Sequence, residues 1–196
     1  MILIDDQIQE YTPEEIARWT DELPEWRRKQ VLAYKNDMGR RQSLLAYRLL
    51  CQGLREEYGI MEQPTFVYNE HGKPYIIIKN EKLKIKNVEG PHFSLSHCKE
   101  GVCCAISDRP VGIDIESASR KISDSVIRYS MNEGEQALIR ESDDPQRTFL
   151  RLWTQKEAVL KRLGTGIRDD MRDILSDYAY TIEVRENERY ILSVAW

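Results

Sequence analysis

Cysteine is scarce in this sequence, and its few positions exclude two classes of small protein. Of the 196 residues only 4 are cysteine, and no two of them form a Cys-x-x-Cys pair. A zinc framework and a disulfide scaffold both need several cysteines at set spacings. The cysteines are Cys51, Cys98, Cys103 and Cys104. We therefore expect free thiols and reducing surroundings.

An excess of basic charge and a long apolar run are also missing. The 29 lysines and arginines are outnumbered by 33 aspartates and glutamates, so nucleic acid is not an expected partner. Apolar runs such as residues 75–78 are far shorter than the roughly 20 residues that a membrane span needs. The first residues, Met-Ile-Leu-Ile-Asp-Asp-Gln, lack the basic region of a signal peptide. We expect a soluble, cytoplasmic protein without a membrane partner.

What the sequence does contain is enough for a folded core. Hydrophobic residues make up 41% of the chain, whose length permits one domain or two of about 100 residues each. Helical spacing and capping signals predict helices that begin at residue 12 and cover residues 24–35, 40–58, 130–140 and 146–163. Short β-rich segments predict strands at residues 2–8, 65–68, 75–79, 93–96, 102–106, 111–116, 178–185 and 189–195.

The order of these elements indicates an α+β fold. Helices and then strands are followed by a further strand, helices and a final pair of strands, which favours a mostly antiparallel sheet over a βαβ fold. The turn Asp108-Arg109-Pro110 divides the chain into halves of similar size, residues 1–108 and 109–196. Because no low-complexity linker separates them, we expect the two halves to pack closely.

The segment Gly112-Ile113-Asp114-Ile115-Glu116 carries two carboxylates on one face of a predicted strand. Side chains alternate across a strand, so Asp114 and Glu116 share a face with Gly112 and lie about 7 Å apart at their Cα atoms. Two carboxylates at this spacing can converge on one hard cation, and Gly112 leaves room for a ligand near the backbone. The alternative is a strand with one solvated face.

The predicted helix over residues 146–163 places Lys156 inside an apolar stripe, with Glu157 beside it and Lys161 one turn on. The stripe consists of Phe149, Trp153, Leu160 and Leu163. A charge in an apolar stripe conflicts with the local pattern, and such conflicts tend to mark functional sites. The alternative is a lysine with a buried stem and a solvated ammonium, next to a surface Glu–Lys pair.

Three further segments carry residues with chemical potential. Phe93-Ser94-Leu95-Ser96-His97 is a short strand ending in a histidine, but it lacks the glycines of a nucleophile elbow, so a Ser–His hydrolase is poorly supported. Gly72-Lys73-Pro74 is a turn that presents a lysine. Glu133 is the fourth residue of a predicted capping box that begins at Ser130, which favours a structural role.

Together, in this order, these segments resemble the motif series of the phosphopantetheinyl transferases of the larger, surfactin-synthetase-activating type. The series runs Gly72-Lys73-Pro74, Phe93-Ser94-Leu95-Ser96-His97, Gly112-Ile113-Asp114-Ile115-Glu116 and Trp153-x-x-Lys156-Glu157-x-x-x-Lys161. The resemblance implies a pseudo-dimer of two similar α+β halves, which agrees with the division near residue 108. Because both halves are present in one chain, we also expect a monomer.

The resemblance implies a reaction of the holo-[acyl-carrier-protein] synthase type. The phosphopantetheine arm of coenzyme A would pass to a serine of an apo acyl or peptidyl carrier protein, and 3′,5′-adenosine bisphosphate would leave. The family's Mg²⁺ ligands correspond to Asp114, Glu116 and Glu157. The contacts to coenzyme A correspond to Lys73, Ser96, His97 and Asp114, with His97 near the 3′-phosphate.

The same resemblance implies catalytic roles for three residues of the long helix. These are Glu157, Lys161 and Lys156. Both lysines would lie by the phosphates and stabilise the charge that builds up during transfer. Glu157, or a water molecule that it orients, would take the proton from the carrier serine.

One position departs from the family pattern. Members often carry an arginine before a serine or threonine at the start of the third helix, as part of the nucleotide site. This chain has Gln42-Ser43 there, and glutamine supplies no positive charge. Arg40 and Arg41, just upstream, are therefore the candidates for contacting the 3′-phosphate.

Two other functions are compatible with these residues. A magnesium-dependent phosphoesterase or nuclease could use the same acidic cluster, and it would release products without modifying a protein. A non-enzymatic adaptor would use the strand and the long helix only as structural elements. Its ligand binding would not depend on a metal.

Overall fold

The computed structural model describes all residues except 81–84, 167–170 and 177–178. The helices are α1 (Pro13–Asp21), α2 (Glu25–Leu32), α3 (Asp37–Tyr58), α4 (Asp124–Ser130), α5 (Glu133–Glu141), α6 (Pro145–Leu163) and the short 3₁₀ helix η2 (Ile174–Ser176). The strands are β1 (Ile2–Asp5), β2 (Thr65–Tyr68), β3 (Pro74–Asn80), β4 (Ile85–Glu89), β5 (His92–Cys98), β6 (Gly101–Ser107), β7 (Gly112–Ser117), β8 (Ile182–Glu186) and β9 (Tyr190–Ala195). Among the described residues, no helix has both the length and the apolar character that crossing a membrane requires.

The strands form small antiparallel sheets, which confirms the α+β class predicted from the element order. The orders are β1-β6-β5, β2-β3-β4 and β7-β9-β8. The predictions omit β4 and α4, which carry no strong periodic signal. They also begin the penultimate strand at residue 178, which lies outside the described residues, whereas β8 begins at Ile182.

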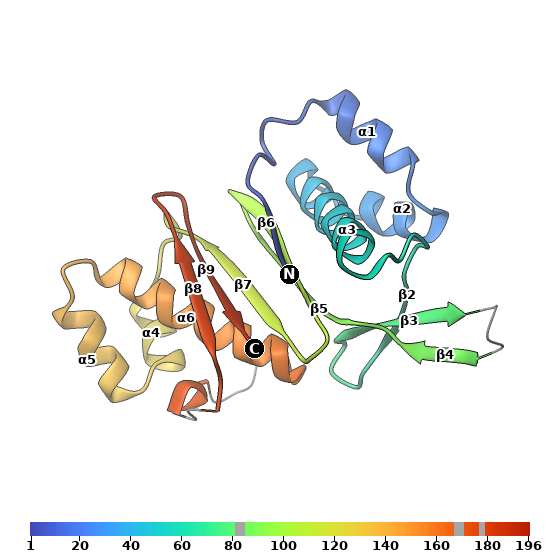
Figure 1. Cartoon of the computed structure of the whole chain (residues 1–196). Coiled ribbons are helices and arrows are strands. Elements are labelled where there is room, and N and C mark those ends of the chain that lie inside the picture. Colours follow the sequence, from blue (N-terminus) through green and yellow to red (C-terminus); the bar gives the residue numbers. More distant parts are fainter. Residues whose placement is uncertain (81–84, 167–170, 177–178) are drawn as a thin grey trace.

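The core is layered, with two helices outside and two sheets between them (Figure 1). Helix α3 covers one face of the β1-β6-β5 sheet, and the other face of that sheet packs against β7-β9-β8. Helix α6 covers the far face of β7-β9-β8. The β2-β3-β4 sheet extends to one side of these layers. The relation of the two halves as a pseudo-dimer, and their boundary at residue 108, stay predictions.

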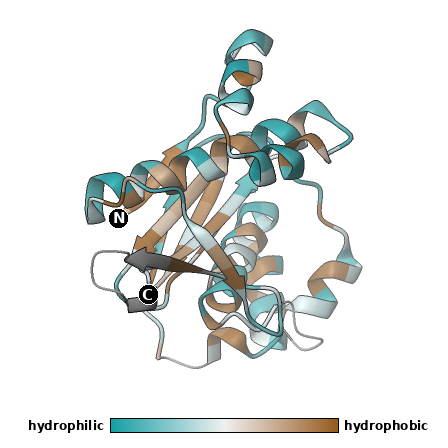
Figure 2. Cartoon of the chain, turned by 90° about the vertical axis from the view of Figure 1, so that its right-hand side faces the viewer, coloured by the Kyte–Doolittle hydropathy of each residue, from teal (hydrophilic) through white to brown (hydrophobic). Residues whose placement is uncertain are grey.

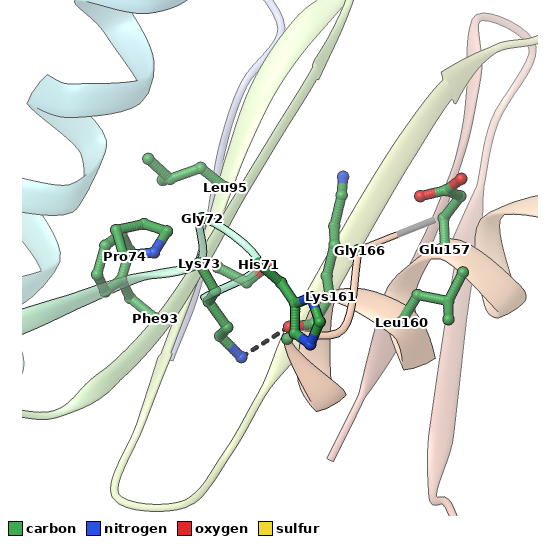
Figure 3. A pocket seen from close by; sticks show the side chains of 12 residues that line it. His71, Gly72, Lys73, Pro74, Phe93, Leu95, Glu157, Leu160, Lys161 and Gly166 are labelled. Carbon is green, nitrogen blue, oxygen red and sulfur yellow. Dashed lines mark hydrogen bonds between the residues drawn. The ribbon is translucent and has the colours of Figure 1, made fainter. Parts of the chain in front are cut away.

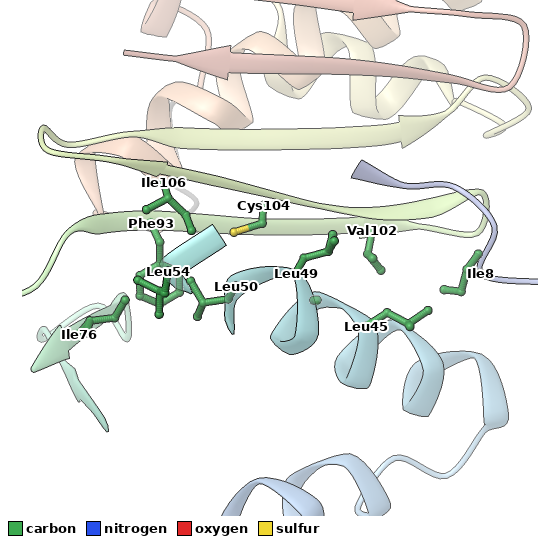
Figure 4. Packing of buried hydrophobic residues seen from close by; sticks show 11 residues of the cluster. Ile8, Leu45, Leu49, Leu50, Leu54, Ile76, Phe93, Val102, Cys104 and Ile106 are labelled. Atoms are coloured by element: carbon green, nitrogen blue, oxygen red, sulfur yellow. The ribbon is translucent and has the colours of Figure 1, made fainter. Parts of the chain in front are cut away.

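Strand β6 is buried on both faces, which explains its uninterrupted run of small and apolar residues. Val102, Cys104 and Ile106 pack toward α3, whereas Cys103 and Ala105 pack toward the second sheet. Figure 4 shows the first group opposite the leucines of α3. Figure 2 shows a similar separation for the coloured part of the chain, with brown on the inner strands and teal on much of the helices.

Strand β7 separates the candidate carboxylates from the apolar core by simple alternation. Ile113 and Ile115 pack into the core between the two sheets. Asp114 and Glu116 point to the other side, where each contacts a side chain of α6. The sequence left open that the carboxylate face of this strand is solvated. In the structure, helix α6 covers that face.

Gly112 serves helix packing rather than ligand approach, which corrects the interpretation from sequence. A Cβ atom at this position would lie 1.9 Å from the carbonyl oxygen of Ala158 and 2.4 Å from the amide nitrogen of Arg162, both in α6. The absence of a side chain lets the helix backbone lie directly on the strand. This close contact sets the distance between the carboxylates of β7 and the lysine of α6.

We expect Gly112→Ala to lower the free energy of unfolding by about 3 kcal/mol, because the atoms it would meet are backbone atoms that cannot move aside alone. Gly134→Ala in α5 is the matched control, since its Cβ would meet only Asn132 Oδ1 at 3.5 Å. That variant should be neutral or slightly stabilising. Chemical denaturation of both proteins measures the difference. Equal stabilities would show that α6 does not rest on Gly112.

Most of the predicted capping signals mark helix ends in the structure, although α3 begins at Asp37 rather than near residue 40. The capping box at Thr12 and Glu15 is present, and Gly59 and Gly164 end α3 and α6 in the left-handed conformation. The box predicted at Ser130 begins two residues later, at Asn132 with Glu135. The reason is tertiary, because Ser130 ends α4 and its carbonyl oxygen accepts a hydrogen bond from Lys156 of α6.

Candidate active site

Three elements, β5, β7 and α6, bring the central candidates together. Ser96 on β5 donates a hydrogen bond of 2.8 Å from Oγ to Asp114 Oδ1 on β7. The ammonium of Lys161 on α6 lies 2.7 Å from the same carboxylate oxygen and 2.8 Å from Ser96 Oγ. The amide of Ile115 also donates to Ser96 Oγ, at 3.4 Å. A hydroxyl, a carboxylate and an ammonium thus form one buried network.

The other carboxylate oxygen of Asp114, Oδ2, is left over from this network. It is buried and lacks a hydrogen-bond partner in the described part of the chain. Asp114 as a whole is only 5% exposed. Leaving such an oxygen unsatisfied is costly, so it marks a place for an external cation or donor.

Glu116 lies two residues further along the same face of β7. Its carboxylate accepts hydrogen bonds from the Arg120 guanidinium and, at 3.2 Å, from the Trp153 indole N–H. The guanidinium also lies over the Trp153 ring, 5.0 Å from its centroid. Burial and the charge of Asp114 raise the pKa of Glu116 to about 7, against the opposing effect of Arg120. The positive charge of Arg120 thus compensates the negative charge of Glu116 only in part.

Glu157 on α6 lines the same pocket as Asp114 and Glu116 and is 9% exposed. Burial and the charge of Asp114 raise its pKa, and the attraction of Lys161 and Arg120 reduces this effect. A carboxylate with a raised pKa is suited to accept a proton near neutral pH.

Lys161 is the main positive charge of the cluster. Burial disfavours its charged form, but the attraction and the hydrogen bond of Asp114 outweigh this effect, so the pKa of Lys161 is raised. Its side chain is still 30% exposed. The ammonium therefore stays charged at neutral pH, and the side chain lines the space in front of the carboxylates.

His97 ends the series on β5, one residue beyond Ser96, and its side chain is exposed at the edge of the cluster. Partial desolvation by surrounding protein atoms and the nearby charge of Lys161 lower the pKa of His97, against the attraction of Asp114. An imidazole that is neutral in the free protein can take up a proton when an anion binds next to it. His97 is therefore suited to bind phosphate.

Two pockets that share residues open over this network. They have volumes of about 360 Å³ and about 390 Å³ and share Leu95, Glu157 and Lys161. The first contains the carboxylates Asp114 and Glu116. The second extends to the β2–β3 turn and has mostly apolar walls. Figure 3 shows this second pocket, with walls from the turn, β5 and α6. The combined space suits a ligand with a charged end and a long body.

Lys73 lines the second pocket, but its ammonium contacts the protein itself. Nζ donates to the carbonyl oxygens of Lys161 and Arg162, at 2.6 and 2.8 Å. Burial and the charge of Arg162 lower the pKa of Lys73 to about 8. The lysine expected to contact coenzyme A is thus bound to the end of α6.

Lys156 lies away from the network, which corrects its expected place beside the phosphates. Its side chain is 0% exposed. The ammonium lies 2.7 Å from Glu135 Oε2 and donates to the carbonyl oxygen of Ser130 at 2.8 Å. It also donates to the carbonyl oxygens of Met171 and Arg172. The conflict seen in the sequence is therefore resolved by a buried ion pair that ties α6 to α5 and to the following segment.

The arginines at the start of α3 also bind within the protein. Arg41 Nη1 donates to the carbonyl oxygen of Tyr11 at 2.6 Å, and Arg40 Nε to that of Tyr34 at 2.9 Å. The described residues that line the two pockets include neither arginine. Gln42 does approach the site, because its side-chain amide donates to the carbonyl oxygen of Cys98 at 2.9 Å, one residue beyond His97.

The residues fit a hard divalent cation in their chemistry, although they are not assembled as a ligand set. Among the described residues, no group of three or more His, Cys, Asp or Glu side chains is arranged to hold a metal ion. The unpartnered Oδ2 of Asp114 and the raised pKa of Glu116 and Glu157 nevertheless show uncompensated negative charge. Oxygen ligands of this kind suit Mg²⁺.

Arg120 belongs to the site and was missed by sequence reasoning. It follows β7 and returns its guanidinium to Glu116 and over Trp153. No periodicity or motif marks it, because its position depends on how the chain turns after the strand. A basic residue a few positions after an acidic strand is the only signal that could have drawn attention to it.

Comparisons with known proteins agree with the resemblance. A sequence profile of the 4′-phosphopantetheinyl transferase superfamily matches residues 110–193. The chain is similar to the 4′-phosphopantetheinyl transferase psf-1 of Bacillus pumilus, with 34% identity over 131 residues that cover 65% of this chain and 52% of that protein. It is also similar to the 4′-phosphopantetheinyl transferase gsp of Aneurinibacillus migulanus, with 31% identity over 144 residues that cover 72% and 56%.

A third relative matches a shorter stretch. The 4′-phosphopantetheinyl transferase Sfp of Bacillus subtilis strain 168 is 32% identical over 104 residues, which cover 52% of this chain and 42% of that protein. The chain thus spans about half the length of the curated relatives it matches.

Proposed function

We propose that this chain, whose residues 110–193 match the sequence profile of the 4′-phosphopantetheinyl transferase superfamily, transfers phosphopantetheine from coenzyme A to a serine of an apo carrier protein. The observation that carries the proposal is the unpartnered Asp114 Oδ2 in a pocket that also contains the Lys161 ammonium. Such a site can hold a cation on one side and an anion on the other, as a transferring diphosphate requires.

Coenzyme A fits the proposed site in its distribution of charge. Lys161 and Arg120 line the acidic pocket and offer positive charge to a diphosphate. Leu95 and Leu160 belong to the mostly apolar wall of the adjoining pocket, which suits the uncharged parts of the substrate. Both pockets have walls from the two halves of one chain, so the proposal includes a monomeric enzyme. It also includes a cytoplasmic location, as expected from the sequence.

Magnesium belongs to the proposal through the three carboxylates. Asp114, Glu116 and Glu157 would hold the ion, which would neutralise diphosphate charge and make the phosphorus easier to attack. The ion pairs of Asp114 with Lys161 and of Glu116 with Arg120 would then share these carboxylates with it. Addition of Mg²⁺ alone should therefore raise the melting temperature of the wild type.

The residues of the chain itself serve proton transfer and charge stabilisation. The serine oxygen forms a bond to the β-phosphorus, and the bond from that phosphorus to the oxygen of 3′,5′-adenosine bisphosphate breaks. Glu157, with its raised pKa, takes the serine proton directly or through water. Lys161 stays charged and stabilises the negative oxygens, and Ser96 orients both Lys161 and Asp114.

Intact-mass analysis of apo carrier proteins after incubation with coenzyme A, Mg²⁺ and the enzyme tests the proposal. A carrier protein that gains the mass of one phosphopantetheine supports it, and chelation of the metal should abolish the gain. Cleavage of coenzyme A without protein modification would instead indicate a phosphoesterase. If coenzyme A bound without reaction and without metal dependence, the chain would be an adaptor.

His97 provides a prediction about the 3′-phosphate of coenzyme A. That group carries roughly −1.5 to −2 charges near neutral pH. We expect His97→Ala to reduce the preference for coenzyme A over dephospho-coenzyme A by about 1.5–3 kcal/mol, the value of one charge-assisted hydrogen bond. Arg41→Ala should leave the preference unchanged, because its guanidinium is bound at Tyr11. The ratio of kcat/KM values for the two substrates measures it.

The pH dependence of this ratio has a definite sign. The pKa of His97 is lowered from its ordinary value near 6.5, so the free imidazole is mostly neutral at neutral pH. Protonation as the pH falls adds the charge that the phosphate attracts. The wild-type preference should therefore increase from pH about 8 to about 6, and His97→Ala should remove this change. An equal change in the variant would assign the effect to the titration of the phosphate itself.

A further inference from the structure

The β2–β3 turn is bound to the C-terminal end of α6 by side chains of the turn. Asn69 Nδ2 donates to the carbonyl oxygen of Gly164 at 2.9 Å. Lys73 Nζ donates to the carbonyl oxygens of Lys161 and Arg162, at 2.6 and 2.8 Å. The last carbonyl groups of a helix lack partners within the helix and carry partial negative charge, so an ammonium is well suited to bind them.

The helix end has the shape to receive this lysine. Gly164 ends α6 with φ of +72°, and a Cβ there would lie 2.6 Å from Cδ of Lys73 and 3.3 Å from Nδ2 of Asn69. The same turn is closed from within, because Asn69 Oδ1 accepts the amide of Lys73 at 2.8 Å. Turn and helix end are thus complementary in both hydrogen bonding and shape.

Lys161 connects this contact with the reactive network. Its carbonyl oxygen accepts from Lys73, while its ammonium binds Asp114 and Ser96. In Figure 3 the Lys73 side chain points to the backbone of α6, and the Lys161 side chain runs away from that contact. A shift of the turn would therefore move the backbone that carries the Lys161 ammonium.

The contact also determines the second pocket. One wall of that pocket comes from the turn and the first residue of β3, with Lys73 and Pro74, and the opposite wall comes from α6, with Leu160 and Lys161. The two walls belong to segments about 90 residues apart in the chain, as the separations of 88 and 89 residues between the bonded groups show.

We propose that Lys73 is a positioning residue, which acts by binding the β2–β3 turn to the end of α6 and thereby sets the width of the substrate pocket and the place of Lys161. Its ammonium does not contact a phosphate of the substrate. The kinetic part of the test rests on the proposed transfer from coenzyme A, and the structural part does not.

The kinetic test compares Lys73→Met with the wild type on coenzyme A and dephospho-coenzyme A. We expect the KM for both substrates to rise by about tenfold, because charge-assisted hydrogen bonds that shape the pocket are lost. The ratio of the two kcat/KM values should stay within about twofold, since no phosphate contact is removed. Asn69→Ala should raise KM in the same way, and the double variant should show less than the product of the two effects.

Lys35→Met is the matched control, because Lys35 is an exposed lysine outside both pockets. It should leave every kinetic constant unchanged. A change in the substrate ratio of Lys73→Met by about tenfold or more would assign the ammonium to the 3′-phosphate and overturn the proposal. Unchanged KM and kcat in Lys73→Met would overturn it as well.

Hydrogen–deuterium exchange tests the contact without any activity. Lys73→Met should speed exchange of the turn and the start of β3, residues 69–75, and of the helix end, residues 160–166, while segments of β6 and β9 stay protected. Lys35→Met should exchange like the wild type. If the two regions exchange at wild-type rates in Lys73→Met, the proposal fails even where the transferase function holds. If transfer is absent from the wild type but exchange changes as expected, the proposed function alone fails.

Discussion

Replacing Asp114 by asparagine is expected to slow the proposed phosphopantetheine transfer by a factor of about 100 or more, because it removes a buried carboxylate that would stabilise the transition state through a cation. One oxygen of Asp114 orients Lys161 and Ser96, and the other is unpartnered in the described part of the chain. An amide of the same shape keeps some of these contacts but loses the charge. The measurement is kcat by intact mass of a carrier protein.

Asp143→Asn is the matched control, since Asp143 is an exposed aspartate in the turn before α6. Its kcat should equal that of the wild type. The melting temperature of Asp114→Asn must be recorded, because loss of the partner of Lys161 also affects stability. Near-normal turnover in a folded Asp114→Asn protein would contradict the proposed mechanism. A loss explained by unfolding alone would appear as a reduced folded fraction with normal specific activity.

Lys156→Met is expected to lower the free energy of unfolding by about 3–5 kcal/mol, because it leaves the largely buried Glu135 carboxylate, which is 11% exposed, without its charged partner. The carbonyl oxygens of Ser130, Met171 and Arg172 would lose a donor at the same time. Methionine matches the lysine stem in size, so the effect reports the lost charge rather than a cavity. Chemical denaturation gives the value.

Two comparisons isolate the buried pair. Lys29→Met removes a surface lysine paired with Glu25, with side chains 75% and 71% exposed, and should change stability by less than about 0.5 kcal/mol. The double variant Lys156→Met with Glu135→Gln should recover part of the loss, because the uncompensated charge is then gone. If Lys156→Met were stable and its kcat fell, the lysine would act on the substrate as the family resemblance implies.

Much of the fold is local in origin and could be predicted. The capping box at Thr12 and Glu15 and the glycines at 59 and 164 mark helix ends through the backbone groups of the helix itself. The apolar run of β6 marks a strand that is buried on both faces. Strand β4, helix α4 and the start of α5 were not predicted correctly, since their limits depend on partners elsewhere in the chain.

The sequence by itself determined which residue types are available and which face of a segment they share. Alternation alone puts Asp114 and Glu116 on one side of β7, and order and spacing of the motifs alone indicate the family. Only the tertiary structure decided what each of these side chains meets. Lys156 and Lys161 are five residues apart in one helix, yet the first is bound to Glu135 and the second to Asp114.

Gly112 and Lys73 show the same difference between what the sequence determined and what the tertiary structure decided. In the sequence both suggest contact with a ligand, whereas in the structure Gly112 admits the backbone of α6 and Lys73 binds its last carbonyl groups. The physical reason is that spacing along the chain sets the direction of a side chain relative to its own helix or strand. Which partner fills the space in that direction depends on the packing of segments distant in sequence, and here that partner is the end of α6.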